Sequence, residues 1–141
     1  MFLLDTNVIS ELRKIGVGRA DANVTRWQSA ANTATLYVSV VTLMELEIGT
    51  LLLARRDARQ AAMLREWLEG YVLPEFENRT LAIDRAVALR CARLHVPNRR
   101  PERDAYIAAS ALVHGMAVVT RNTGDYADLG VEVVNPWSAG A

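Results

Sequence analysis

The stretch that decides the fold reads RDAYIAASALVHGMAVVTRNTGDY and covers residues 103–126. Its first half is a predicted helix whose small residues allow close packing against a sheet: Ala105, Ala108, Ala109 and Ala111. Gly115 ends that helix, and the apolar run Ala117–Thr120 suits a buried strand. Polar residues, among them Asp125, follow the strand directly. A helix, a buried strand and then acids predict an α/β protein with a polar site at a sheet edge.

The rest of the chain repeats this alternation of short apolar runs and longer amphipathic stretches, which indicates a mainly parallel sheet covered by helices. Five strands are predicted, at Phe2–Leu4, Leu36–Val40, Arg79–Ile83, Ala117–Thr120 and Val131–Val134. Helices are predicted at Asn7–Arg13, Val24–Ala31, Thr42–Ala54, Arg59–Val72, Arg85–His95 and Asp104–His114. Because no linker interrupts the series, residues 1–141 are expected to form one domain.

Composition excludes several classes of protein. With 51% hydrophobic and 23% charged residues the chain falls in the ordinary globular range. Cys91 is the only cysteine, which excludes an intrachain disulfide and a cysteine-based zinc site. The N-terminus lacks the features of a signal peptide, and no apolar run approaches the roughly 20 residues of a spanning helix, so a cytoplasmic protein without a membrane partner is expected.

The balance of charge limits how nucleic acid would bind. Sixteen basic and 16 acidic residues give a formal net charge of zero. Bulk electrostatics therefore does not draw the chain to a polyanion, and any binding depends on uneven placement of the arginines. Both histidines end predicted helices, where the helix dipole favours a cation and no catalytic role is needed.

Two acids are predicted at the same sheet edge from the first half of the chain. Asp5 ends the first strand, although capping of the next helix would also account for it. Glu45 lies in the first turns of the helix that follows the second strand. Glu47 competes with Glu45, but its side chain leaves the helix about 200° away, so only one of the two faces the edge. Glu45 is chosen, and Glu47 is expected to be solvated or to face a partner.

Two further acids come from the second half. Asp104 opens the sixth predicted helix, where it would also serve as an N-cap. Asp125 follows the fourth strand, where a simple turn role is the alternative. Each pair of carboxylates about 5 Å apart repels by roughly 3 kcal/mol at an effective dielectric near 20, so an ionised cluster needs a cation. Oxygen ligands favour Mg²⁺ or Mn²⁺, and phosphodiester hydrolysis is the chemistry that follows.

Four segments together carry a resemblance to a known family. They are LLDTN at 3–7, SVVTLMELEIG at 39–49, RDAYIAASA at 103–111 and VTRNTGDY at 119–126. In order and spacing they resemble the PIN-domain ribonucleases, in particular the VapC-type toxins of bacterial toxin–antitoxin pairs. The resemblance implies a three-layer α/β/α sandwich around a mainly parallel five-stranded sheet.

The resemblance also implies roles for particular residues. Asp5, Glu45, Asp104 and Asp125 look like the family's catalytic metal ligands for Mg²⁺ or Mn²⁺. The residues expected to orient these carboxylates through hydrogen bonds are Thr6, Asn7, Thr120 and Asn122. An RNA substrate, a homodimer and a cognate antitoxin are implied as partners. The antitoxin would lie across the third and fourth predicted helices. The candidates for its groove are Leu46, Leu52, Leu53, Met63 and Trp67, although packing in the core would also account for each of them.

Two other functions compete with the endoribonuclease. Phosphotransfer on an aspartate also uses acids at strand ends, but it needs a lysine late in the chain, whereas the only lysine is Lys14. A catalytically inactive protein-binding module on the same fold would act through its helical surface alone. Retention of all four acids argues against that module.

Overall fold

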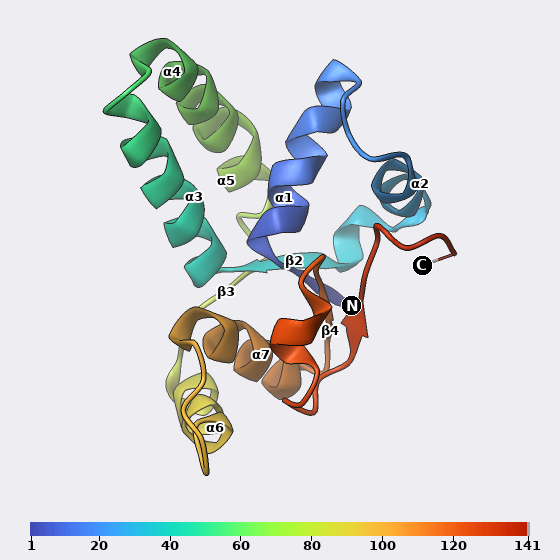
Figure 1. The fold of residues 1–141 in the computed structure, drawn as a ribbon, viewed down its shortest axis with the longest axis vertical. Helices are drawn as coiled ribbons and strands as arrows, with labels where there is room; N and C mark the ends of the chain where they lie inside the picture. Colours follow the sequence, from blue (N-terminus) through green and yellow to red (C-terminus); the bar gives the residue numbers. More distant parts are fainter. Residues whose placement is uncertain (141) are drawn as a thin grey trace.

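The computed structural model describes residues 1–140 and is built on a five-stranded sheet in the order β3-β2-β1-β4-β5 (Figure 1). All four neighbouring pairs are parallel, with Leu3 opposite Tyr37 on one side and Val118 on the other. The α/β class and the five-stranded sheet are thus confirmed, while Ala141 lies outside the described residues. The strands are β1 (Phe2–Leu4), β2 (Leu36–Ser39), β3 (Thr80–Leu81), β4 (Ala117–Val119) and β5 (Val133–Val134).

The helices follow the predicted order with one interruption. The expected helix over Arg59–Val72 ends early at Trp67, and a π-type turn at Leu68–Val72 follows it. Pro74 explains the wider turn, because proline has no N–H to continue the regular α-helical ladder. The helices are α1 (Thr6–Arg13), α2 (Ala22–Ala30), α3 (Val40–Ala54), α4 (Ala58–Trp67), α5 (Leu73–Glu75), α6 (Arg85–Leu94) and α7 (Glu102–His114), with 3₁₀ turns η1 (Lys14–Val17), η2 (Thr33–Thr35) and η4 (Thr123–Tyr126).

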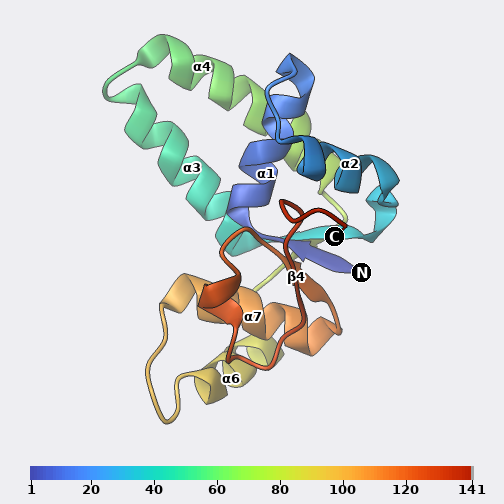
Figure 2. The same ribbon diagram turned by 45° about the vertical axis from the view of Figure 1, so that its right-hand side comes forward.

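The core lies on both faces of the sheet. Successive residues of a strand point to opposite faces, so Leu4 packs with Val8 of α1, whereas Leu3 packs with Ile107 of α7. Figures 1 and 2 show α1 to α5 on one side of the sheet and α6 with α7 on the other. The expected three-layer α/β/α arrangement is therefore confirmed.

Helix α6 forms the outermost part of the second layer. Val87 and Cys91 of α6 pack against Ala105 and Ala109 of α7 in a separate small cluster. The opposite side of α6 is exposed to solvent. No helix within residues 1–140 is both long and apolar enough to cross a bilayer.

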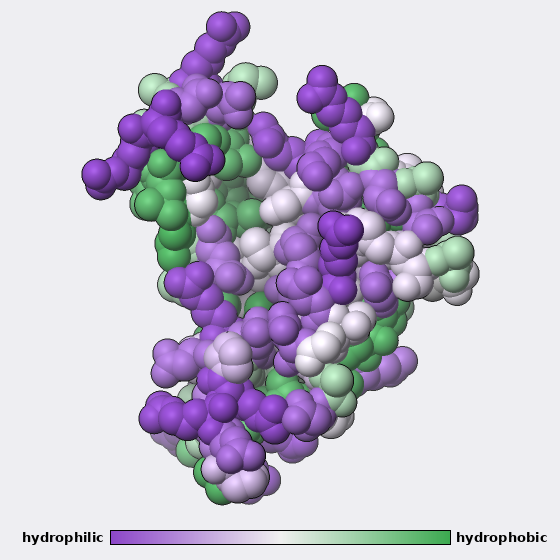
Figure 3. All heavy atoms as spheres, viewed as in Figure 1, coloured by the Kyte–Doolittle hydropathy of each residue, from purple (hydrophilic) through white to green (hydrophobic). Residues whose placement is uncertain are grey.

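The hairpin of α3 and α4 leaves much apolar surface uncovered, as Figure 3 shows at upper left. Leu51, Leu52 and Met63 are each more than half exposed. A groove of about 740 Å³ lies between this hairpin and the end of α1, with Leu53 and Met63 among its lining residues. Of the other residues expected in a groove, Leu46 belongs to the buried core and Trp67 is half-buried against that core.

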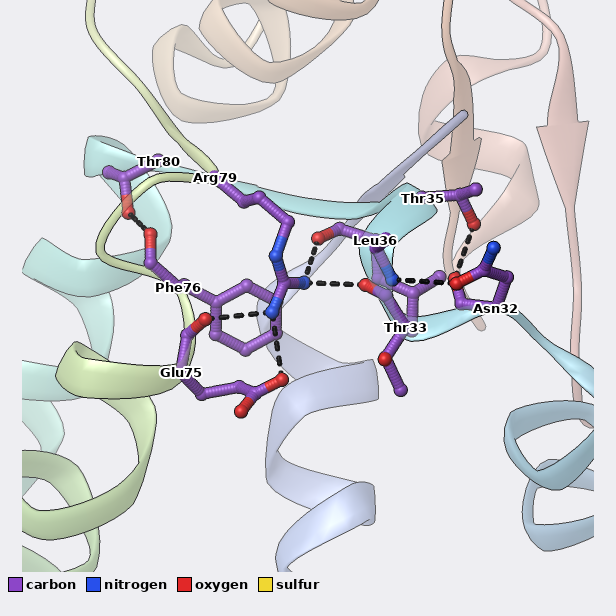
Figure 4. A network of polar contacts seen from close by, with 9 residues as sticks. Asn32, Thr33, Thr35, Leu36, Glu75, Phe76, Arg79 and Thr80 are labelled. Atoms are coloured by element: carbon purple, nitrogen blue, oxygen red, sulfur yellow. Dashed lines mark hydrogen bonds and ion pairs between the residues drawn. The ribbon is translucent and has the colours of Figure 1, made fainter.

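Arg79 ties the start of β2 to the segment before β3 (Figure 4). One of its terminal nitrogens, Nη1, donates to the carbonyl oxygens of Thr33 at 2.7 Å and Leu36 at 2.5 Å. The other, Nη2, donates to the carbonyl and to the carboxylate Oε1 of Glu75, both at 2.7 Å. The guanidinium also lies 4.8 Å from the centre of the Phe76 ring. A single planar side chain thereby satisfies four acceptors.

We predict that Arg79→Ala lowers the free energy of unfolding by about 2–4 kcal/mol, because it leaves several acceptors unsatisfied at once. Urea unfolding followed by circular dichroism measures the change. Arg85→Ala is the matched control: it removes an exposed arginine and should change stability by less than about 0.5 kcal/mol. Equal losses in the two variants would contradict a structural role for Arg79.

Candidate active site

The parallel sheet brings three chain segments to one edge. Asp5 follows β1, and its backbone N–H donates to the carbonyl oxygen of Val119 at 2.9 Å, so the β1–β4 ladder continues into the site. Thr120 follows β4 in the same register. Ser39 ends β2, and its Oγ accepts from the Val41 N–H at 3.0 Å, which starts α3 at this edge. The carboxyl ends of β1, β2 and β4 therefore form one floor.

Asp5 is almost fully buried, with 7% of its surface exposed. Its Oδ1 accepts from the Thr6 N–H at 2.8 Å and caps α1. Its Oδ2 accepts from Thr120 Oγ1 at 2.9 Å, from the Tyr126 hydroxyl at 3.2 Å and, at a longer 3.4 Å, from Asn7 Nδ2. A buried carboxylate with this many donors is held in one orientation.

Glu45 faces the same edge from α3. The Thr6 hydroxyl donates to Glu45 Oε1 at 2.7 Å, and Arg103 Nη1 lies 3.6 Å from Glu45 Oε2. Glu47, the competing acid, is engaged instead by both terminal nitrogens of Arg65 on α4. Its side chain stays 42% exposed, so Glu47 is partly solvated, as expected, while it pairs with Arg65.

Asp104 lies in the first turn of α7, which begins two residues earlier than predicted, so Pro101 takes the cap position. Burial and the negative charges of Asp125, Asp5 and Glu45 raise the pKa of Asp104 from 3.8 to about 6. Asp125 itself is exposed in η4. The three other predicted acids therefore all act electrostatically on Asp104.

Tyr126 is a site residue that the sequence reasoning missed. Its side chain is fully buried against α7, and its hydroxyl donates to Asp5 and lies close enough to Asp104 to oppose the rise in the pKa of that carboxyl. Burial and the charges of Asp5, Asp104 and Glu45 raise the pKa of Tyr126 far above its usual value, so the hydroxyl keeps its proton. The one sequence feature that could have indicated its contact with Asp5 is its position directly after Asp125.

The polar residues around Asp5 form a connected network. Thr120 Oγ1 accepts from Asn7 Nδ2 at 3.2 Å and from the Asn122 backbone N–H at 3.0 Å. Asn7 Oδ1 in turn accepts from the Arg121 N–H at 3.1 Å. Asn122 thus joins the network through its backbone. Thr6, Asn7 and Thr120 join it through their side chains.

Comparison with known proteins places this site in a family. The model of the PIN domain matches residues 2–130. The chain belongs to the PIN-domain family. The plasmid stability protein StbB of Pseudomonas syringae pv. tomato is 40% identical over 99% of this chain and all of the relative. A VapC ribonuclease of Sinorhizobium fredii is 37% identical over 97% of this chain and 98% of its own length.

Solved structures share the fold closely. Toxin FitB of Neisseria gonorrhoeae is 36% identical over 97% of this PIN domain and 99% of the relative. The crystal structure of FitAcB from that organism superposes with a TM-score of 0.87 and 35% identity, covering 97% of this chain and 99% of that chain. A structure of FitAB bound to a DNA fragment gives a TM-score of 0.88 at 34% identity and covers 100% and 99% of the two chains.

The donors of the PIN-domain site fit a hard divalent cation in chemical type. All four acids offer carboxylate oxygens, and the raised pKa of Asp104 reflects its burial together with nearby negative charge, which a cation would offset. Within residues 1–140, however, no three His, Cys, Asp or Glu side chains gather closely enough to hold a metal ion. Asp5 and Glu45 are each held by donors from the protein instead.

We predict that Tyr126→Phe weakens Mn²⁺ binding by about tenfold, because Asp5 and Asp104 lose the hydroxyl that orients them. The ring remains in the core, so the fold is kept. Isothermal titration measures the affinity. Tyr106→Phe is the matched control, since Tyr106 is half-buried in α7 and its hydroxyl has no hydrogen bond within residues 1–140. Unchanged affinity in Tyr126→Phe would rule out this positioning role.

A second prediction concerns pH. The folded-state pKa of Asp104 lies above its unfolded value of 3.8, so its stabilising contribution is complete below that value and is lost as pH rises through about 6. Without metal, wild type should therefore lose stability relative to Asp104→Asn between about pH 4 and pH 6, with no further loss at higher pH. Urea unfolding in EDTA at several pH values measures the difference.

Asp128→Asn is the control for this titration. Hydrogen bonding to Arg100 lowers the pKa of Asp128, so its contribution is lost only as pH falls through that lowered value. The difference between wild type and Asp128→Asn should stay level across the same pH range. If the stability difference between wild type and Asp104→Asn also stayed constant with pH, the pKa of Asp104 would not be raised in the folded protein.

Proposed function

We propose that this PIN domain is a divalent-metal-dependent endoribonuclease and the toxin of a toxin–antitoxin pair. The observation that supports the proposal is that Asp125, Asp5 and Glu45, from three separate segments, are close enough to Asp104 for their negative charges to raise its pKa. The names of its relatives, a VapC ribonuclease and the toxin FitB, support the same activity. RNA is the proposed substrate, and the cytoplasm is the proposed location.

Each residue at the edge has a proposed part in this activity. Asp5, Glu45, Asp104 and Asp125 would hold Mg²⁺ or Mn²⁺. When bound, such an ion supplies a water of lowered pKa and offsets charge on the phosphate under attack. Thr120 and Tyr126 hold the Asp5 carboxylate on one side of the floor. Thr6 holds Glu45 on the other side, so the carboxylates keep their orientation.

Arg103 has a different part. Its guanidinium is about half exposed and lies beside Glu45, at the mouth of the acidic floor. Carboxylates alone repel a phosphodiester, so a cation is needed where the substrate enters. Arg103 is proposed to supply that charge as a positioning residue, with its side chain free to leave Glu45 for a phosphate oxygen.

The proposed antitoxin binds the apolar hairpin. The exposed Leu51, Leu52 and Met63 and the groove beside Leu53 form an uncovered apolar surface on α3 and α4. An amphipathic segment of a partner fits such a surface through its apolar face. Because α3 begins at the site and extends to the hairpin tip, a partner segment that continues along this helix would also reach the acidic floor. A homodimer through other helical surfaces completes the proposed assembly.

We predict that Asp5→Asn reduces cleavage of single-stranded RNA more than about a hundredfold. Asp5 is a proposed ligand of the metal ion, and loss of a ligand weakens metal binding more than loss of a residue that orients a ligand. The amide oxygen of Asn can still cap α1, so the fold is retained. Cleavage of a labelled RNA in Mn²⁺ measures activity. EDTA should abolish cleavage by the wild type.

Glu66→Gln, an exposed change on α4, is the control and should cleave like the wild type. Thermal melting adds an independent readout: Mn²⁺ should raise the melting temperature of wild type but not of Asp5→Asn. Expression in cells should arrest growth for the wild type and for Glu66→Gln but not for Asp5→Asn. A wild type that neither cleaves RNA nor gains stability from Mn²⁺ would favour the inactive binding module.

A further inference from the structure

Positive charge is concentrated in one segment next to the acidic floor. Residues 85–103 contain a single acid, Glu102, although the whole chain has zero net charge. Figure 3 shows strongly hydrophilic side chains at the lower left, where Figure 1 places α6 and the segment leading to α7. The arginines of this segment are Arg85, Arg90, Arg93, Arg99, Arg100 and Arg103.

Helix α6 presents its arginines to solvent. Val87 and Cys91 bury the inner side of the helix against α7. Arg85, Arg90 and Arg93 are exposed, and α6 contains no acid and no aromatic residue. No carboxylate within residues 1–140 lies within ion-pair distance of these three side chains. Their charge is therefore uncompensated on this surface.

The segment between α6 and α7 is fixed beside the site. Arg100 Nη1 donates to both carboxylate oxygens of Asp128, at 3.0 and 2.8 Å, three residues after Asp125. The Arg100 backbone N–H donates to His95 Nδ1 at 3.0 Å. Figure 2 shows this segment running from α6 to the start of α7. The exposed Arg99 lies in this segment, next to the anchored Arg100 and three residues before the start of α7.

Other exposed arginines lie farther away. Arg55, Arg56 and Arg59 follow the far end of α3, whose 15 residues extend about 22 Å from the site. They are equally exposed and equally unpaired within residues 1–140. Exposure alone therefore does not single out the arginines of α6. The arginines of α6 differ in that their helix packs directly on α7, which carries Asp104.

We propose that Arg85, Arg90, Arg93 and Arg99, the basic track, bind the sugar–phosphate backbone of the RNA strand whose scissile bond lies at the acidic floor. The inference rests on the proposed nuclease function and names the surface that holds its substrate. Guanidinium groups suit phosphate oxygens, and α6 spans about 15 Å. Because α6 has no aromatic side chain to stack on bases, the track contributes affinity that does not depend on sequence.

The test compares two triple variants of the full chain. One changes the track (Arg90→Gln, Arg93→Gln and Arg99→Gln), and the other changes the distant arginines (Arg55→Gln, Arg56→Gln and Arg59→Gln). Fluorescence anisotropy in EDTA measures binding of an uncleaved single-stranded RNA at several salt concentrations. The track variant should bind at least about tenfold more weakly, with a salt slope smaller by about 2. The distant variant should bind within about twofold of wild type.

Several outcomes separate this inference from the proposed function. In Mn²⁺ the track variant should show a higher KM on a long RNA and an unchanged kcat on a short oligonucleotide that cannot reach α6. Loss of RNA affinity in the track variant supports the track even if the wild type never cleaves RNA. Absence of cleavage by the wild type would contradict only the proposed nuclease function. A DNA strand of the same sequence should lose affinity equally, since the contacts are to phosphates.

Equal losses in the two triple variants, or no loss in either, would overturn the track. A third outcome would also overturn the track: the track variant binds RNA normally, but the co-expressed antitoxin no longer protects cells from it. That result would assign the surface to a protein partner. Circular dichroism melting of both variants confirms that each is folded before binding is compared.

Discussion

The burial of one negative charge organises this end of the molecule. Asp5 sits directly after β1 with 7% exposure, and its carboxylate receives hydrogen bonds from the Thr6 N–H, Thr120 and Tyr126. A buried anion is tolerated only when donors replace the lost water. Since Thr120 and Tyr126 reach Asp5 only when β4 pairs with β1, the helix cap, the central strand pairing and the candidate site form together.

Features that depend on local sequence were predictable. The positions of the strands and of Asp5, Glu45 and Asp104 follow from apolar runs and from the acids that come just after them. Tyr126 was not predictable in this way, because its role comes from contacts with residues far away in the chain. The same holds for Arg79, whose carbonyl partners Thr33 and Leu36 belong to another segment.

Charge is balanced over the chain but not over its surface. The acids face one floor, whereas the arginines of residues 85–103 lie beside it. Arg103 and Arg100 connect the two regions through Glu45 and Asp128. This separation lets a neutral protein attract a polyanion to one place while keeping there the carboxylates that a divalent ion requires. The net charge of zero gave no indication of this separation of acids and arginines.

The sheet ends abruptly on both sides. Its outer strands, β3 (Thr80–Leu81) and β5 (Val133–Val134), are two residues long each. So short an edge offers few free backbone groups for an added strand, which protects the monomer from edge-to-edge aggregation. It also disfavours binding of a peptide as an additional strand at the sheet edge. Proteins that bind this molecule are therefore expected to contact its helices rather than to add a strand to its sheet.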